Sequence, residues 1–147
     1  MKVDKVLIPI DFSENADRIL TDGIFVAEKF GAEIHVVFAA QIFQDYSEFF
    51  VMHVPNIQYE ENIVASAEKR MKVFLEKSQG EDFKCKHKIL SGDVAESILE
   101  YVEEEGINMI VMGTHGYKGL DKILFGSVAE KVVKMAKCPV LTINPYR

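Results

Sequence analysis

Residues 109–136 read MIVMGTHGYKGLDKILFGSVAEKVVKMA, in which an apolar run, a glycine-punctuated loop and a helical pattern follow one another. The run stops at Gly113, the loop extends to Phe125, and the helical pattern opens directly after Gly126 at Ser127. A strand, a loop and a helix start in this order bring unpaired backbone N–H groups and the positive end of a helix dipole to one point. Glycines there let the backbone turn tightly and approach a ligand. The stretch therefore predicts a phosphate cradle in a nucleotide-binding α/β domain.

The rest of the chain alternates between strand-like and helix-like segments. Mostly apolar runs predict strands over residues 3–10, 33–40, 83–90, 109–112 and 140–143. Apolar residues at helical spacing predict helices over residues 16–30, 59–77, 94–105 and 127–136. This alternation is typical of an α/β fold with a doubly wound parallel sheet and helices on both faces. Because no repeat or linker interrupts it, we expect residues 1–147 to form one domain.

Local signals mark the ends of several of these elements. Ser13 is the expected N-cap of the first helix, and Gly31 is expected to end that helix. Three lysines alternate with apolar residues in the segment 83–90, which predicts a strand near a sheet edge. Residues 41–58 are rich in aromatic side chains, and we interpret them as a loop with a short helical turn at 46–50. A hydrophobic flap over the core and a lid over a ligand both fit that composition.

The strand order follows from where the candidate ligand-binding residues fall. In an open α/β sheet, ligands bind beyond the carboxyl ends of the strands, where the strand order reverses. Asp11 follows the first expected strand, Ala39 and Ala40 end the second, and Gly113 ends the fourth. These ends converge if strands one and four are neighbours, so the predicted order of the five-stranded sheet is 3-2-1-4-5.

Composition excludes several classes of protein. The 147 residues carry 17 basic and 23 acidic side chains, for a net charge of −6. Such a chain lacks the basic footprint of a duplex-binding protein and the polybasic surface that seeks anionic lipid. No apolar stretch could span a bilayer and the first residues show no secretory pattern, so we expect a cytoplasmic protein with no nucleic-acid or membrane partner. Cys85 and Cys138 lack metal-ligand spacing and are expected to be reduced, mostly buried thiols.

The glycine spacing is G-x2-G-x9-G-S, formed by Gly113, Gly116, Gly126 and Ser127. It is not a Walker A loop, because no G-K-[ST] closes it. It also differs from the dinucleotide fingerprint, whose third glycine lies on the helix directly after the turn. Glycines that merely form turns are the alternative to a phosphate site. The position between a buried strand and a helix start favours the phosphate site.

The chain resembles a universal stress protein of the UspA superfamily over essentially its full length. The resemblance rests on residues 9–13 (PIDFS), 113–116 (GTHG), 124–130 (LFGSVAE) and 138–141 (CPVL), together with the glycine spacing. In that family this spacing marks the members that bind ATP. The resemblance implies a Rossmann-like fold of the adenine nucleotide alpha hydrolase-like class and a dimer that pairs through the last strand.

Carried over by position, the resemblance implies a set of nucleotide-binding residues. These candidates are Pro9, Ile10, Asp11, Ala39, Met112, Gly113, His115, Gly116, Gly126, Ser127, Val128 and Ala129. Asp11 and the backbone near Ala39 would meet the adenine or ribose, and Gly113 would approach the ribose. The residues around the phosphates would be His115, Gly116, Gly126, Ser127 and Val128. The chain departs from many relatives at residues 39–41, where AAQ replaces a bulkier valine or isoleucine followed by an acidic residue.

The chemistry of these side chains supports the assignment of some residues to the nucleoside and others to the phosphates. Each residue also has an alternative role. Asp11 would be repelled by a polyphosphate, so it suits a base amine or a ribose hydroxyl, or else a local turn. Ser127 can offer its hydroxyl and N–H to a phosphate, or cap its helix. His115 could donate to a phosphate or be an ordinary loop imidazole. Lys118 and Lys122 could offset phosphate charge or be solvated.

Three functional hypotheses follow. The first is a regulatory or stress-response protein that binds ATP and hydrolyses it slowly or not at all, because no positioned base or activated nucleophile is evident. The second is an ATP-hydrolysing or adenylyl-transfer enzyme of the same architecture. The third is a dimeric interaction module with an empty pocket. Any Mg²⁺ would be held mainly by the phosphates, since His35, His53 and His87 lie on separate elements and form no metal site.

A homodimer is the expected assembly. The strand predicted over residues 140–143 is apolar and would otherwise leave an open sheet edge.

Overall fold

The computed structural model describes residues 1–41, 56–114 and 126–147. Several predictions lie outside these residues: the helical turn at 46–50, the flap or lid, and the roles of His53, His115, Gly116, Lys118 and Lys122.

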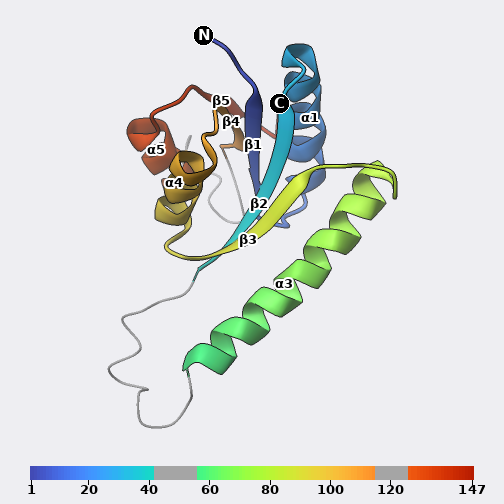
Figure 1. Ribbon diagram of the computed structural model, residues 1–147, viewed down its shortest axis with the longest axis vertical. Helices are drawn as coiled ribbons and strands as arrows, with labels where there is room; N and C mark the ends of the chain where they lie inside the picture. The colour runs from blue at the N-terminus through green and yellow to red at the C-terminus, as the bar shows by residue number, and fades with distance from the viewer. Residues whose placement is uncertain (42–55, 115–125) are drawn as a thin grey trace.

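A parallel sheet forms the centre of the molecule (Figure 1). Its strands are β1 (Lys5–Ile10), β2 (Glu33–Gln41), β3 (Lys86–Gly92), β4 (Met109–Gly113) and β5 (Val140–Ile143). The described helices are α1 (Ala16–Phe30), α3 (Asn56–Gln79), α4 (Val94–Glu105) and α5 (Ser127–Met135). The strands lie in the order β3-β2-β1-β4-β5 and every pairing is parallel, which confirms the predicted class and strand order.

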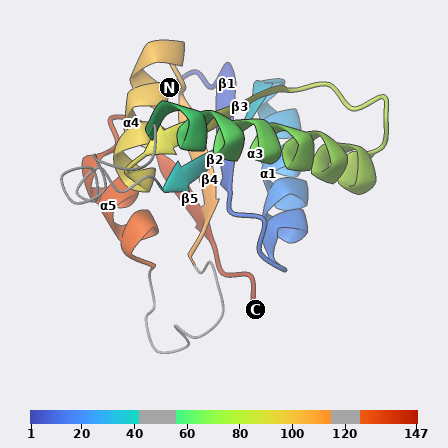
Figure 2. The same ribbon diagram turned by 90° about the horizontal axis from the view of Figure 1, so that it is seen from below.

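Helices cover both faces of this sheet, with α1 and α3 on one side and α4 and α5 on the other (Figures 1 and 2). Successive strand residues point to opposite faces. In β1, Val6 and Ile8 pack into the core under α1 and α3, whereas Leu7 packs into the core under α4 and α5. A strand buried on both faces has no polar side to alternate with, which accounts for the continuous apolar run in β4.

The predicted end of α1 at Gly31 is confirmed, and α4 has the bounds predicted from its apolar spacing, residues 94–105. Gly31 and Gly106 end α1 and α4 in the left-handed conformation, with φ angles of 63° and 64°, which glycine adopts without steric cost. Asp93 caps the start of α4, where its side chain accepts a hydrogen bond from the Glu96 backbone N–H at 2.9 Å.

The prediction that Ser13 caps α1 is wrong. The N-cap position belongs to Asn15, whose side chain makes no capping bond. Ser13 instead forms a turn ahead of the helix: its hydroxyl accepts from the Asn15 N–H at 3.4 Å, and its carbonyl oxygen accepts from the Ala16 N–H at 3.0 Å. The turn delays the helix start because the chain must first leave the end of β1.

The largest differences from the predicted spans are at the starts of two elements. The helix α3 begins at Asn56, ahead of the predicted start at residue 59. The edge strand β3 begins at Lys86 instead of residue 83, where its ladder with β2 opens opposite His35. Residues 83–85, which belong to the alternating pattern, therefore precede the strand and do not pair with β2.

The imidazole of His35 is fully buried and fully hydrogen-bonded. Its Nε2 lies 2.6 Å from a carboxylate oxygen of Glu33, and its Nδ1 lies 2.8 Å from the hydroxyl oxygen of Tyr101. A carboxylate only accepts, so Nε2 carries the proton and Nδ1 accepts from the tyrosine. Hydrogen bonds from His35 and Lys86 lower the pKa of the Glu33 carboxyl. Burial raises the pKa of Tyr101 to about 12. These groups fasten α4 to the β2–β3 side of the sheet.

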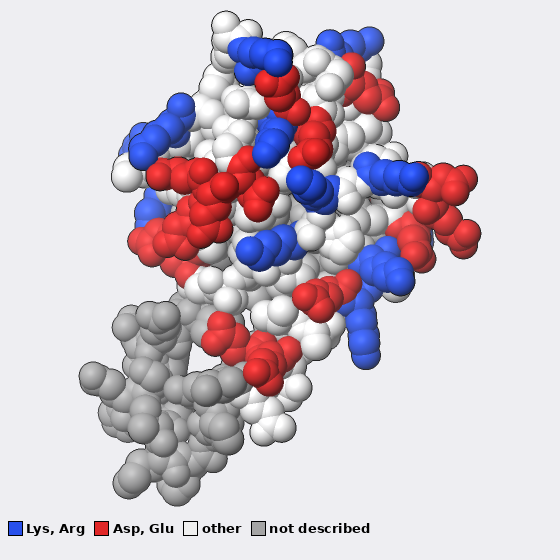
Figure 3. Space-filling model, in the orientation of Figure 1, with Lys and Arg blue, Asp and Glu red and all other residues white. Residues whose placement is uncertain are grey.

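The surface carries interspersed charges. On the face shown in Figure 3, basic and acidic side chains lie beside one another over α4 and the edge strand β3. Cys85 and Cys138 are free, and both are half-buried rather than mostly buried. Burial raises the pKa of the Cys85 thiol to about 11. In the described parts of the chain, no helix is both long and apolar enough to cross a bilayer.

Candidate functional site

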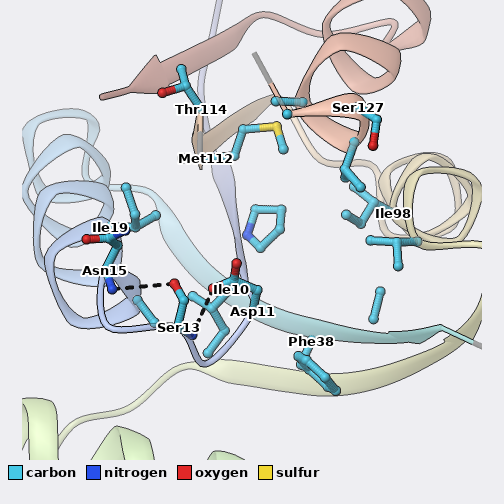
Figure 4. Close-up of a pocket in the computed structure, with 18 of the residues that line it drawn as sticks. Ile10, Asp11, Ser13, Asn15, Ile19, Phe38, Ile98, Met112, Thr114 and Ser127 are labelled. Atoms are coloured by element: carbon cyan, nitrogen blue, oxygen red, sulfur yellow. Dashed lines mark hydrogen bonds between the residues drawn. The ribbon is translucent and has the colours of Figure 1, made fainter. Parts of the chain in front are cut away.

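A cavity of about 430 Å³ opens at the carboxyl ends of β1, β2 and β4, beside the N-terminal ends of α1, α4 and α5 (Figure 4). This is where the strand order reverses, since β1 is flanked by β2 on one side and β4 on the other. Of the predicted binding residues, Pro9, Ile10, Asp11, Ala39, Met112, Gly113, Gly126, Ser127, Val128 and Ala129 line it. His115 and Gly116 lie outside the described residues. The structure thus brings every described candidate to one cavity.

One end of the cavity is formed by the segment that follows β1. The Oδ1 atom of Asp11 accepts a hydrogen bond from the Ser13 backbone N–H at 2.9 Å (Figure 4). The local turn considered for Asp11 is therefore present. The other carboxylate oxygen has no partner among the described residues, so it remains able to accept a bond from a ligand.

An unusual backbone conformation at Phe12 orients this segment. Its φ of 57° lies in the left-handed region, which a bulky residue rarely adopts. The Phe12 ring packs 4.6 Å from the ring of Phe38 and 5.8 Å from that of Phe74, and the Arg70 guanidinium lies 4.7 Å above it. These aromatic contacts compensate the backbone strain. They draw Phe12 into the core under α1 and α3 while Asp11, one residue earlier, lines the cavity.

The opposite end is formed by the start of α5. Gly126 occupies the N-cap and the nine-residue helix begins at Ser127, so the alternative that Ser127 caps α5 is wrong. The N–H groups of Ser127, Val128 and Ala129 are the first of the helix, and such groups have no acceptor within it. They lie at the positive end of the helix dipole, beside the Ser127 hydroxyl (Figure 4).

Two amides of the predicted cradle are bonded inside the protein. The Thr114 N–H donates to the Ile143 carbonyl oxygen at 2.9 Å, and the Gly126 N–H donates to the Thr114 carbonyl oxygen at 2.7 Å. Within the described residues, the donors left for a ligand at this end are those of residues 127–129.

The same contact explains the glycine at position 126. Its φ of −59° is open to any residue, but a Cβ there would lie 3.3 Å from the Thr114 carbonyl oxygen. Gly126 thus permits two backbone segments to approach each other.

Many residues of the cavity wall were not predicted from the sequence. The additional lining residues are Ser13, Asn15, Ala16, Ile19, Phe38, Gln41, Val94, Ile98 and Thr114. Ile19 and Ile98 belong to helical patterns that predict core, and both are buried. The signal that could have found them is position: each lies in the first turns of a helix that follows a strand, at the carboxyl edge of the sheet.

The charges at the site are sparse. Asp11 is the single carboxylate among the described lining residues, and no lysine or arginine appears among them. The lysines of α5 turn to acidic partners: Lys131 Nζ lies 3.0 Å from a Glu96 oxygen, and Lys134 Nζ lies 2.6 Å from one of Glu130. The hydrogen bond from Lys134 lowers the pKa of the Glu130 carboxyl, and the hydrogen bond to Glu96 raises the pKa of the Lys131 ammonium. The cavity can hold an apolar planar group between one acceptor and a row of N–H donors.

A metal site is not formed by the described side chains. No group of three histidine, cysteine or acidic residues in these parts of the chain is arranged to hold an ion.

Comparison with known proteins identifies close relatives. The profile of the Universal stress protein family matches residues 2–144. Universal stress protein MJ0531 of Methanocaldococcus jannaschii is 31% identical over 142 residues, which span 95% of this chain and 81% of that protein.

Solved structures share the fold. The structure of MJ0577, a universal stress protein of the same organism, superposes with a TM-score of 0.77 at 27% identity, covering 98% of this chain and 97% of that one. A universal stress protein from Archaeoglobus fulgidus, solved in complex with dAMP, superposes with a TM-score of 0.60 at 19% identity, covering 98% of this chain and 100% of that one. At that identity the likeness concerns the fold alone.

Proposed function

Because the chain belongs to the universal stress protein family, we propose that it binds ATP in this cavity and acts as a regulatory or stress-response factor. One observation carries the proposal: the cavity holds Asp11 at one end and the first amides of α5 at the other, with apolar walls between them. A protein of the same fold, the universal stress protein from Archaeoglobus fulgidus, was solved with the adenine nucleotide dAMP.

The Asp11 end would hold the nucleoside. A planar base gains from apolar contact with Ala39, Phe38 and Met112. The free oxygen of Asp11 accepts but cannot donate, so it matches the exocyclic amine of adenine or a ribose hydroxyl. Ala39 leaves room for the base, and the Gln41 amide can both donate and accept at the rim.

The α5 end would hold the phosphates. The N–H groups of Ser127 and Val128 donate to phosphate oxygens, and the Ser127 hydroxyl adds a further donor. His115 and Gly116 would complete this end. Mg²⁺, where present, would bind mainly to the phosphates, because the described lining supplies a single carboxylate at the opposite end.

Hydrolysis would be slow or absent. General-base catalysis needs a side chain within hydrogen-bond reach of the attacking water. No histidine, cysteine or second carboxylate lines the described part of the cavity. An ATP-hydrolysing or adenylyl-transfer enzyme is the competing proposal, and an interaction module without nucleotide is the third.

One experiment separates the three. The purified protein is denatured and its supernatant analysed for adenine nucleotide, and a nucleotide-free sample is titrated with ATP, GTP and adenosine in a calorimeter. Bound ATP, with little release of ADP or AMP after Mg²⁺ is added, is the expected result. Rapid turnover would favour the enzyme. An absence of nucleotide, with no thermal shift at millimolar ATP, would favour the interaction module and contradict our proposal.

We further propose a homodimer that pairs along β5. The two sheet edges differ: β3 carries Lys86 and Lys88, whereas β5 has no charged residue and exposes 42% of Leu141. Lysines protect an edge strand from pairing, and their absence leaves β5 open to the same strand of a second copy. A dimeric mass by light scattering at micromolar concentration is expected, and a monomeric mass would contradict the pairing.

A further inference from the structure

The turn that carries Asp11 depends on the conformation of the residue after it. Phe12 has a φ of 57°, and the Asp11 carboxylate accepts the Ser13 N–H across it (Figure 4). A phenylalanine favours a negative φ, because in the left-handed region its Cβ crowds the neighbouring carbonyl oxygen. The left-handed conformation therefore persists only while contacts of the ring hold it. A change of φ at Phe12 would move Ser13, and with it the hydrogen bond that fixes the Asp11 carboxylate.

Three side chains hold the Phe12 ring, and two of them belong to α3. Phe38 of β2 packs against the ring at 4.6 Å. Phe74 of α3 meets it edge-on at 5.8 Å, and the Arg70 guanidinium of the same helix lies 4.7 Å from its centroid. No described residue of α3 lines the cavity. The contacts with Phe12 therefore connect this helix to the Asp11 turn.

Arg70 is the contact that can be removed without opening the core. Phe38 and Phe74 pack against the core cluster under α1 and α3, whereas Arg70 is exposed. A cation over the face of an aromatic ring is attracted by the negative charge of that face. Among the described residues no acidic side chain forms an ion pair with Arg70, so its guanidinium has no competing partner there.

We propose that Arg70 is a positioning residue for the nucleoside end of the cavity. By holding the Phe12 ring it keeps Phe12 in the left-handed conformation, and so keeps the Asp11 carboxylate aimed into the cavity. This inference rests on the proposed function, in which Asp11 binds the nucleoside. Arg70 itself touches no ligand, so its whole effect on ATP binding passes through Phe12 and Asp11.

Three variants of α3 test this role. Arg70→Ala removes the cation from the Phe12 ring. Arg70→Lys returns a cation to the ring and should rescue binding, since a lysine ammonium is attracted to an aromatic face as well. Lys69→Ala removes the neighbouring exposed cation, which lies away from Phe12, and is the matched control. The two alanine variants change the net charge and the helix propensity of α3 alike.

The measurement is ATP affinity by calorimetry, with the fold checked by circular dichroism. We expect Arg70→Ala to lose about fourfold, the value of an exposed cation–π contact, and Arg70→Lys to lose less than about twofold. Lys69→Ala should bind as the wild type does.

A double-mutant cycle separates positioning from a general loss of stability. If Arg70 acts by aiming the carboxylate, Arg70→Ala should cost less than about 1.5-fold once Asp11→Asn has removed that carboxylate. It should still cost about fourfold in the Ser127→Ala background, because Ser127 lies at the opposite end of the cavity.

Four results would overturn the inference and leave the proposed function standing. They are wild-type ATP affinity in Arg70→Ala, an equal loss in Lys69→Ala, no rescue in Arg70→Lys, and a fourfold loss that persists in the Asp11→Asn background. A failure of ATP to bind the wild type would remove the proposed function as well.

Discussion

The two ends of the cavity are built from different parts of the chain. At one end a side chain, Asp11, is aimed by a strained residue, Phe12, whose ring is held by Phe38. At the other end the donors are backbone amides at the start of α5, and a glycine lets that helix approach Thr114. Side chains can distinguish one base from another, whereas amides at a helix start bind any phosphate. The comparison predicts that selectivity among bases comes from the Asp11 end. It also predicts that the affinity gained from the phosphates comes from the α5 end.

Gly126→Val is expected to have the largest effect on ATP binding. Its branched side chain would start 3.3 Å from the Thr114 carbonyl oxygen and force the start of α5 away from the cavity. We expect ATP affinity to fall about 100-fold, or about 2.8 kcal/mol, while the circular dichroism spectrum stays native. Gly126→Ala is the graded control and should lose less. Wild-type ATP affinity in Gly126→Val, measured by calorimetry, would show that α5 does not bind the phosphates.

Asp11→Asn should act on the nucleoside end. The amide oxygen can still accept from the Ser13 N–H and keep the turn, but the charged acceptor for the ligand is lost. We expect about a tenfold loss of affinity, at least as large for adenosine as for ATP, because removing the carboxylate also removes its repulsion of the phosphates. Calorimetric titration with both ligands measures the ratio. A loss confined to ATP would reverse our assignment of the two ends.

Ser127→Ala should have a smaller effect that is confined to the phosphates. Only the hydroxyl donor is lost, since the backbone N–H of residue 127 remains. ATP affinity is expected to fall about fivefold, the value of one hydrogen bond, and adenosine affinity should not change. Equal losses for both ligands would mean that Ser127 does not face the phosphates.

Tyr101→Phe is expected to leave ATP affinity unchanged and to lower the stability of the fold. Removing the hydroxyl leaves the buried Nδ1 of His35 without its donor, which should lower the free energy of unfolding by about 1–3 kcal/mol. Denaturant unfolding at neutral pH measures this loss. A reduced ATP affinity would show that the α4 packing reaches the cavity.

Tyr101 also predicts a dependence on pH. Its pKa is raised from 10.0 to about 12 in the folded protein, so its contribution to stability is complete below pH 10.0 and disappears as the pH rises toward 12. The wild type should lose its advantage over Tyr101→Phe across that interval. A constant difference in unfolding free energy would contradict the raised pKa.

The arrangement of strands and helices could be predicted because the periodicity of apolar residues reports burial directly. The run at residues 109–112 indicates a strand covered on both faces, and the lysines at 84, 86 and 88 indicate an edge. Ser13 misled the prediction of the first helix start, because a serine two residues after an aspartate can form a turn as well as cap a helix.

The candidate site was predictable only in part. The glycines around residues 113–127 are visible in the sequence because they break the surrounding patterns. Ile19, Ile98 and Phe38 are not, because an apolar residue that lines a cavity obeys the same periodicity as one that packs in the core. The bond between Thr114 and Gly126 was also hidden, since a backbone contact leaves no mark on residue type.

A crystal structure of the protein grown with ATP tests the central claim most directly. We predict density for the adenosine beside Asp11 and Ala39, and phosphate oxygens within hydrogen-bond distance of the Ser127 and Val128 amides. Phosphates bound away from the start of α5, or a nucleotide outside the cavity between β1 and β4, would contradict the account.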